Sequence, residues 1–196
     1  SLCAFHNNIK VAHLEAGLRT GDPFSPWPEE ANRRMASVIS SIHLAPTQQA
    51  KKNLIKESFQ ERNIYIVGNT VIDSLLFCRE KISKNRNIKK RLEKKFSFLN
   101  QNKKTILVTC HRRESFGKEF LKICEAIRDI SKNKDLQIVF PVHLNPNVQK
   151  PVKQVLKNID NIFLIEPQSY LEFIYLMDTS YLILTDSGGV QEEAPS

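Results

Sequence analysis

The stretch NIFLIEPQSYLEFIYLMDTSYLILTDS, residues 161–187, contains one complete strand–helix–strand repeat. Residues 161–167 and 181–187 are short apolar runs, and residues 169–180 carry apolar side chains at helical spacing behind a capping serine. When a single helix connects two strands of a sheet, the strands run parallel and the connection is a right-handed crossover. The stretch therefore predicts a parallel α/β sheet.

The same alternation extends toward the N-terminus over most of the chain. The pattern predicts further strands over 9–16, 41–47, 64–68, 105–109 and 137–143, and helices over 29–40, 47–58, 120–132 and 146–158. A break near Gly68, followed by a long helix, favours two Rossmann-like α/β domains that face a cleft. We expect the first domain to be incomplete, because three strands are few for a covered sheet and more strands are expected upstream.

The two predicted domains are represented to different extents in the sequence. Residues 1–68 are interpreted as the second half of an N-terminal domain and 69–196 as most of a C-terminal domain, with 69–102 as a leading helix and basic connector.

The net charge of the chain is +8, but residues 79–104 alone carry eleven Lys or Arg against Glu80 and Glu93. No aromatic ladder accompanies this local basic segment, so we interpret it as a solvated helix face or connector rather than a nucleic-acid patch, and we expect no nucleic-acid partner.

The cysteines are scattered and form no CxxC pair, which favours neither a zinc site nor a disulfide framework and indicates a reducing, cytoplasmic compartment. They are Cys3, Cys78, Cys110 and Cys124. No apolar run reaches the roughly 18 residues of a membrane-spanning helix, so we expect no membrane association.

Polar residues gather where the predicted strands end. They are Glu15, the HRRE run at 111–114, His143, Gln168 and the DSGG run at 186–189. Ligands bind at the carboxyl ends of strands in open parallel sheets. Two adjacent arginines and a histidine favour a bound phosphate or carboxylate over the alternative, a surface cluster of salt bridges. The SGG turn lets backbone amides approach a phosphate, although a tight structural turn explains it equally well.

Other polar residues have structural explanations. His13 and His43 lie within apolar runs and are interpreted as core or edge residues. Glu29 and Glu30 follow Pro28 and suit the first turn of a helix, so residue type alone leaves a structural and a functional role open.

Five motifs in this order resemble the bacterial non-hydrolysing UDP-N-acetylglucosamine 2-epimerases. They are HLEAGLRTGDPFSPWPEEANRR, GNTVIDSLL, HRRESFG, PVHLNPNV and LTDSGGVQEEAPS. The resemblance implies the two-domain glycosyltransferase B fold and the interconversion of UDP-N-acetylglucosamine and UDP-N-acetylmannosamine without metal or nicotinamide. It also implies that UDP is eliminated and re-added, that the product serves cell-surface polysaccharides, and that the full-length protein is a homodimer.

The resemblance also implies roles for individual residues. It assigns catalysis to Glu15, Glu29 and His111, and substrate binding to Gln168, Phe173, Ser187, Gly188 and Glu193. Arg112 and His143 match positions that touch a second, activating UDP-N-acetylglucosamine in several members. Cys110 replaces the usual glycine before the histidine; we interpret it as a tolerated small buried side chain rather than a disturbance of the backbone.

The resemblance implies that this chain is an internal fragment, without the N-terminal part and the C-terminal end of the family. A third catalytic carboxylate, an aspartate, and an arginine-bearing phosphate loop are expected upstream, so we expect the fragment alone to be inactive. Three alternatives stay open: a UDP-sugar-binding remnant without catalysis, a hydrolysing epimerase that releases free sugar, and a glycosyltransferase of the same fold.

Overall fold

The chain folds into two compact units, each built from parallel strands and helices. The computed structural model describes residues 1–110 and 117–196. The units comprise Ser1–Asp73 and Ser74–Ser196, and the division falls within helix α4 (Thr70–Lys84). Every strand pair in both sheets is parallel, which confirms the predicted α/β class. The assignment of domains to 1–68 and 69–196 stays a prediction.

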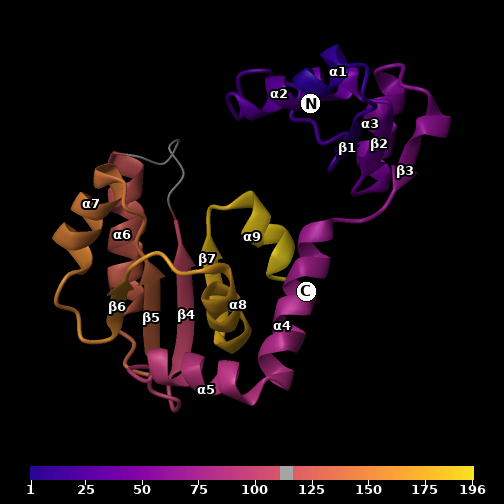
Figure 1. Cartoon of the computed structure of the whole chain (residues 1–196). Coiled ribbons are helices and arrows are strands. Elements are labelled where there is room, and N and C mark those ends of the chain that lie inside the picture. Colours follow the sequence, from indigo (N-terminus) through magenta and orange to yellow (C-terminus); the bar gives the residue numbers. More distant parts are fainter. Residues whose placement is uncertain (111–116) are drawn as a thin grey trace. The chain divides into compact units, whose positions relative to one another are not determined.

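Unit 1 contains a three-stranded sheet in the order β1-β2-β3 (Figure 1). Its strands are β1 (Ala12–Leu14), β2 (Ile42–Ala45) and β3 (Ile64–Ile66), and its helices are α1 (Leu2–His6), α2 (Glu29–Ile39), α3 (Gln48–Lys56) and the 3-10 helix η1 (Glu61–Asn63). Helix α3 starts behind Thr47, whose hydroxyl accepts the backbone N–H of Ala50 at 3.1 Å. The core is small and consists of Ala16, Ala45, Ala50, Leu54 and Ile64.

Unit 2 contains a four-stranded sheet in the order β6-β5-β4-β7. Its strands are β4 (Lys104–Thr109), β5 (Leu136–Pro141), β6 (Ile162–Ile165) and β7 (Leu182–Thr185), and its remaining helices are α5 (Arg86–Lys95), α6 (Lys118–Ile130), α7 (Pro146–Leu156), α8 (Tyr170–Thr179) and α9 (Gly188–Glu193). Strand β7 lies at one edge, where Tyr181 and Leu182 are exposed.

The two faces of the unit 2 sheet carry separate apolar cores. Along β4, Ile106 and Val108 point into a cluster with α6 and α7, whereas Leu107 points into a cluster with α4, α5, α8 and α9. Figure 1 shows α6 and α7 together on one side of the strands. Successive strand residues face opposite sides, so an uninterrupted apolar run is what a strand covered on both faces requires.

The first predicted strand is shorter in the structure than in the sequence pattern. The apolar run over 9–16 suggested a long strand, but β1 comprises only Ala12–Leu14. Among the described strands β1 pairs with β2 alone, and only three residues of each strand are in register. Single backbone hydrogen bonds continue on either side of β1, from Ser41 to the Val11 carbonyl and from Ala16 to the Leu44 carbonyl. The extended conformation ends at Glu15, which has a φ of 63°, and this limits the strand.

Candidate functional site

Three predicted site residues of unit 2 follow three strands of one parallel sheet. His143 follows β5, Gln168 follows β6, and Ser187 follows β7. Because β4 pairs in parallel with β5 and β7, and β5 with β6, the carboxyl ends of these strands meet at one edge. These residues therefore share the sheet edge at which α/β proteins bind ligands.

The turn after β7 leads directly into helix α9. Ser187 is the residue before the helix, and its backbone N–H donates to the Thr185 hydroxyl at 2.9 Å. Ser187 and Gly188 are half-buried. A β-carbon placed on Gly189 would find nothing nearer than the Ser187 hydroxyl at 3.9 Å, so the turn is open on this side.

Glu193, the last residue of α9, is only 7% exposed. Burial raises the pKa of its carboxyl group, and a hydrogen bond with Tyr170 opposes that shift. The pKa of Tyr170 is raised by burial and by the negative charge of Glu193. Sequence patterns did not single out Tyr170, because its partner lies on a different helix, 23 positions along the chain.

Gln168 and Phe173 flank the start of helix α8. The Gln168 side-chain amide donates to the Glu166 carbonyl, and its Oε1 is enclosed without a hydrogen-bond partner among the described residues. Phe173 is half-buried and packs against the core between the sheet and α8. An enclosed acceptor without a donor is costly in a folded protein, so Oε1 suits a ligand that brings an N–H or O–H group.

The start of α8 is held by a charged pair. Glu172 accepts the backbone N–H of Ser169 at 3.0 Å and forms an ion pair with Lys95 of α5 at 2.7 Å. The hydrogen bond from Lys95 lowers the pKa of Glu172 to about 2. This pair fixes the segment that carries Gln168 and Phe173.

Two of the predicted catalytic carboxylates belong to unit 1. Glu15 immediately follows β1, is exposed, and has a φ of 63°. Glu29 is the first residue of α2, behind Pro28, and is also exposed. The adjacent Glu30 is fully buried and pairs with Arg34 at 3.2 Å. Glu29 and Glu30 both lie in the first turn of α2, but of these two only Glu29 is accessible to a ligand.

Three other sequence interpretations concern histidine and cysteine. His43 is buried in β2 and His13 is half-buried in β1, as expected for core or edge residues. Cys110 is 7% exposed within the core of unit 2, in agreement with its interpretation as a small buried side chain. Burial, and then the charge of Asp186, raise the pKa of the Cys110 thiol to about 12. His111 and Arg112 lie outside the described residues.

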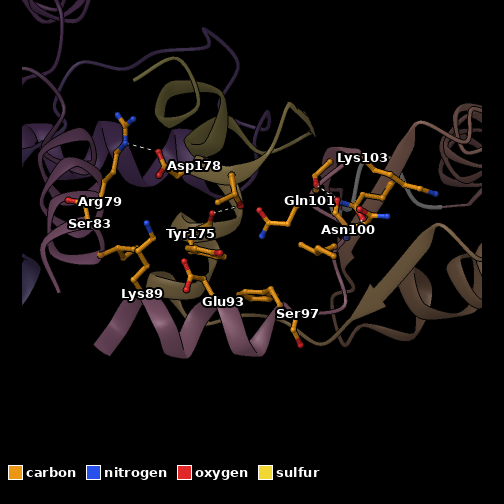
Figure 2. Close-up of a pocket in the computed structure, with 16 residues that line it drawn as sticks. Arg79, Ser83, Lys89, Glu93, Ser97, Asn100, Gln101, Lys103, Tyr175 and Asp178 are labelled. Atoms are coloured by element: carbon orange, nitrogen blue, oxygen red, sulfur yellow. Dashed lines mark hydrogen bonds and ion pairs between the residues drawn. The ribbon is translucent and has the colours of Figure 1, made fainter. Parts of the chain in front are cut away.

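A pocket of unit 2 is lined by other residues than these (Figure 2). It has a volume of about 590 Å³ and lies near the amino ends of β4 and β5, where Thr105 and Gln137 line it. Charged side chains on its wall include Arg79 and Asp178, which form an ion pair at 2.6 Å. The pocket contains none of the predicted site residues, so pocket size alone does not locate the site.

Within residues 1–110 and 117–196, no group of three or more His, Cys, Asp or Glu side chains is arranged to hold a metal ion. None of the helices in the same ranges combines the length and apolar character needed to cross a bilayer.

Comparison with known proteins places this arrangement in one family. The sequence model of the UDP-N-acetylglucosamine 2-epimerase family matches residues 1–196. The chain is 56% identical over 200 residues to the UDP-N-acetylglucosamine 2-epimerase of Campylobacter jejuni and 54% identical over 197 residues to that of Yersinia pestis. In both cases it matches over 100% of its own length and 52% of the relative's, so it spans about half the length of these proteins.

Solved structures agree with the sequence matches. A crystal structure of the Neisseria meningitidis UDP-GlcNAc 2-epimerase bound to UDP-GlcNAc gives a TM-score of 0.94 at 50% identity, covering 100% of this chain and 53% of the other. The Methanocaldococcus jannaschii enzyme in complex with UDP-GlcNAc and UDP gives a TM-score of 0.79 at 41% identity, covering 98% and 52%. The chain therefore belongs to the UDP-N-acetylglucosamine 2-epimerase family.

Proposed function

We propose that the full-length protein interconverts UDP-N-acetylglucosamine and UDP-N-acetylmannosamine by eliminating and re-adding UDP. The observation that carries this proposal is the TM-score of 0.94 with a family enzyme whose crystal structure holds UDP-GlcNAc. Activity is assigned to the full-length protein because the chain spans about half of its relatives. We expect residues 1–196 alone to be inactive.

The reaction explains why accessible carboxylates are needed in unit 1. Inversion at C2 requires one group to remove a proton from one face of the sugar and another to return a proton on the opposite face. Glu15 and Glu29 are exposed, and a carboxylate that exchanges protons with a substrate must be accessible. Glu30 is fully buried and paired, so we assign it a structural role.

Unit 2 supplies groups suited to the UDP moiety. We assign the turn at Ser187 and Gly188 to the diphosphate, because backbone amides at a helix start favour anions. We assign Gln168 and Phe173 to uridine, and the enclosed Oε1 of Gln168 supports this role. We assign Glu193 to the ribose, since a carboxylate accepts hydrogen bonds from two neighbouring hydroxyl groups.

Several finer statements stay predictions for the full-length protein. These are the two-domain glycosyltransferase B arrangement, the homodimer, the cytoplasmic location, the supply of polysaccharide precursors, the role of His111 at the diphosphate, and the activating site at Arg112 and His143. None of them is needed for the reaction test.

The first experiment follows the C2 proton by NMR in heavy water. UDP-N-acetylglucosamine is incubated with the full-length protein and, in parallel, with residues 1–196. We expect loss of the C2 proton signal and appearance of UDP-N-acetylmannosamine with the full-length protein alone. Free N-acetylmannosamine plus UDP would instead indicate a hydrolysing epimerase, and UDP binding without exchange would indicate a transferase or a non-catalytic binder.

The same assay tests the two carboxylates in the full-length protein. Glu15→Gln and Glu29→Gln keep the side-chain shape but cannot transfer the proton, so we expect turnover to fall by orders of magnitude while UDP binding persists. Full turnover in both variants would rule out the assigned roles.

A further inference from the structure

Arg19 is the fourth residue after Glu15, in the loop that follows strand β1, and its guanidinium is nearly enclosed. Only 7% of its side chain is exposed. Burying an arginine costs free energy unless its charge is neutralised and its N–H groups are hydrogen-bonded. The surroundings of Arg19 satisfy both conditions.

Glu57, at the end of helix α3, neutralises the charge of Arg19. The Arg19 Nε donates to one Glu57 carboxylate oxygen at 2.7 Å, and Nη2 donates to the other at 2.8 Å. The hydrogen bond from Arg19 lowers the pKa of Glu57, so the pair stays charged near neutral pH. Two parallel hydrogen bonds fix the direction of the guanidinium as well as its position.

Arg19 also contacts its own loop and helix α2. Its Nη1 donates to the Leu18 carbonyl at 2.8 Å, and Nη2 donates to the Ser37 hydroxyl at 3.0 Å. Ser37 is fully buried in α2, and its hydroxyl donates a hydrogen bond to the Arg33 carbonyl at 3.0 Å. One side chain thus joins the loop after β1, helix α2 and helix α3.

Gly17 anchors the same loop at a second point. A β-carbon at Gly17 would lie 2.2 Å from the Ala50 carbonyl oxygen of α3, and Gly17 has a φ of 87°. The Asn53 side chain donates to the Gly17 carbonyl at 2.9 Å. The loop backbone therefore lies directly on α3, at a distance that only glycine permits.

The conformation of Glu15 depends on such anchors. Its φ of 63° lies in the left-handed region, which residues other than glycine adopt when the surrounding structure holds them there. The next residue, Ala16, donates its backbone N–H to the Leu44 carbonyl at 3.0 Å. The direction of the exposed Glu15 side chain is thus set by a backbone that Gly17 and Arg19 hold from the other end.

We propose that Arg19, acting with Glu57, is a positioning residue that holds the Glu15 carboxylate in a fixed place relative to helix α2, which begins at Glu29. The proposal rests on the proposed function, because it assumes that both glutamates serve one reaction. Ser37 lies about two helical turns from Glu29, roughly 12 Å along the axis, so a bond at Ser37 constrains the rigid helix that carries Glu29. A displacement of about 1 Å between reacting groups lowers a rate by roughly 100-fold.

The test uses the full-length enzyme and three substitutions. Glu57→Gln removes the charge partner, and Arg19→Lys keeps the charge but loses the paired geometry. Lys51→Gln is the matched control, because it removes an ion pair of 2.8 Å with Glu61 from the same helix α3 without touching the loop. For each variant we measure kcat and KM for epimerisation, and hydrogen exchange of the backbone over residues 14–20.

We expect Glu57→Gln and Arg19→Lys to lower kcat by about 10-fold to 100-fold and to leave KM within about threefold. Hydrogen exchange over residues 14–20 should become faster in both variants, and Lys51→Gln should change neither quantity. The double variant should be little worse than either single variant, because both changes break one interaction.

Three results would overturn the proposal. Unchanged kcat in both variants of an active enzyme would show that the anchor does not position Glu15, although the proposed function would stand. A raised KM in Arg19→Lys with a normal Glu57→Gln would mean that Arg19 touches substrate directly. A wild-type enzyme without epimerase activity would remove the proposed function itself.

If Glu57→Gln does not fold, Ser37→Ala provides the second variant. It removes one hydrogen bond from Arg19 and fits the helix, so the fold should survive. A lower kcat with faster exchange over residues 14–20 would support the proposal, and a normal kcat would contradict it.

Discussion

The surroundings of Glu193 suit a carboxylate that binds a ligand. It is nearly enclosed, its partner Tyr170 is on another helix, and burial raises its pKa. If Glu193 accepts the ribose hydroxyls, Glu193→Gln in the full-length protein should weaken UDP binding by about 10-fold to 100-fold, since a hydrogen bond to a charged group contributes about 1.5–3 kcal/mol.

Calorimetric titration with UDP and 2′-deoxy-UDP tests this assignment. Loss of the 2′-hydroxyl should weaken binding to the wild type more than to the Glu193→Gln variant. Glu192→Gln is the control, because it changes the neighbouring exposed carboxylate. Equal losses of affinity in wild type and Glu193→Gln would disprove the ribose contact.

At the level of single residues, the sequence identified candidate types but not their environments. Glu29 and Glu30 were equivalent by residue type, and burial separates them, because Glu30 is enclosed beside Arg34. The Arg19–Glu57 pair joins residues 38 positions apart. No local pattern contains such a pair, so only the folded chain reveals it.

At the level of elements, helix α8 carries part of the predicted uridine site and depends on a charged pair. Glu172→Gln would weaken the ion pair to Lys95 and the contact to the Ser169 N–H. We expect a loss of about 1 kcal/mol in the free energy of unfolding at neutral pH, the usual size for a helix-start contact. Urea unfolding followed by circular dichroism measures this loss.

The pH dependence of the same variant gives a second check. The folded-state pKa of Glu172 is lowered from 4.5 to about 2, so its contribution is complete above pH 4.5 and declines as pH falls toward 2. The difference between wild type and Glu172→Gln should shrink over that range. Glu119→Gln, which removes an exposed pair with Lys122, should cost little at any pH.

Most elements were predictable because their apolar spacing is regular. The predicted helix over 169–180 corresponds to α8, and the predicted strand over 105–109 to β4. The predicted ends of the elements were less accurate, as β1 shows, since a strand ends where a residue leaves the extended conformation, and Glu15 does so with a φ of 63°. Helix α1 was not predicted, and none of its residues is buried.

At the scale of the whole molecule, the two units should respond differently to acid. Burial lowers the pKa of His13 and of His43, both in unit 1, and the charge of His43 adds to the shift of His13. Above pH 6.5 the two histidines are neutral in the folded and in the unfolded state, so they take no stability from unit 1. Below 6.5 the unfolded chain takes up protons first, so unit 1 loses stability until its folded-state histidines also protonate.

Hydrogen exchange between pH 8 and pH 5 tests this expectation in the full-length protein, after correction for the intrinsic pH dependence of exchange. Protection of β1 and β2 should fall with pH more than protection of β4 and β5. His43→Gln should flatten the response, whereas His6→Gln, at an exposed position, should not. An equal response in both units would contradict the assignment to His13 and His43.

Strand β7 has a hydrogen-bonded neighbour on only one side among the described strands, and Tyr181 and Leu182 are exposed beside it. A free strand edge offers unpaired backbone groups to any extended segment it meets. For laboratory work, we therefore expect copies of residues 1–196 to associate through this edge in concentrated samples, which light scattering would detect. A charged substitution at Leu182 is the practical remedy when this piece is prepared by itself.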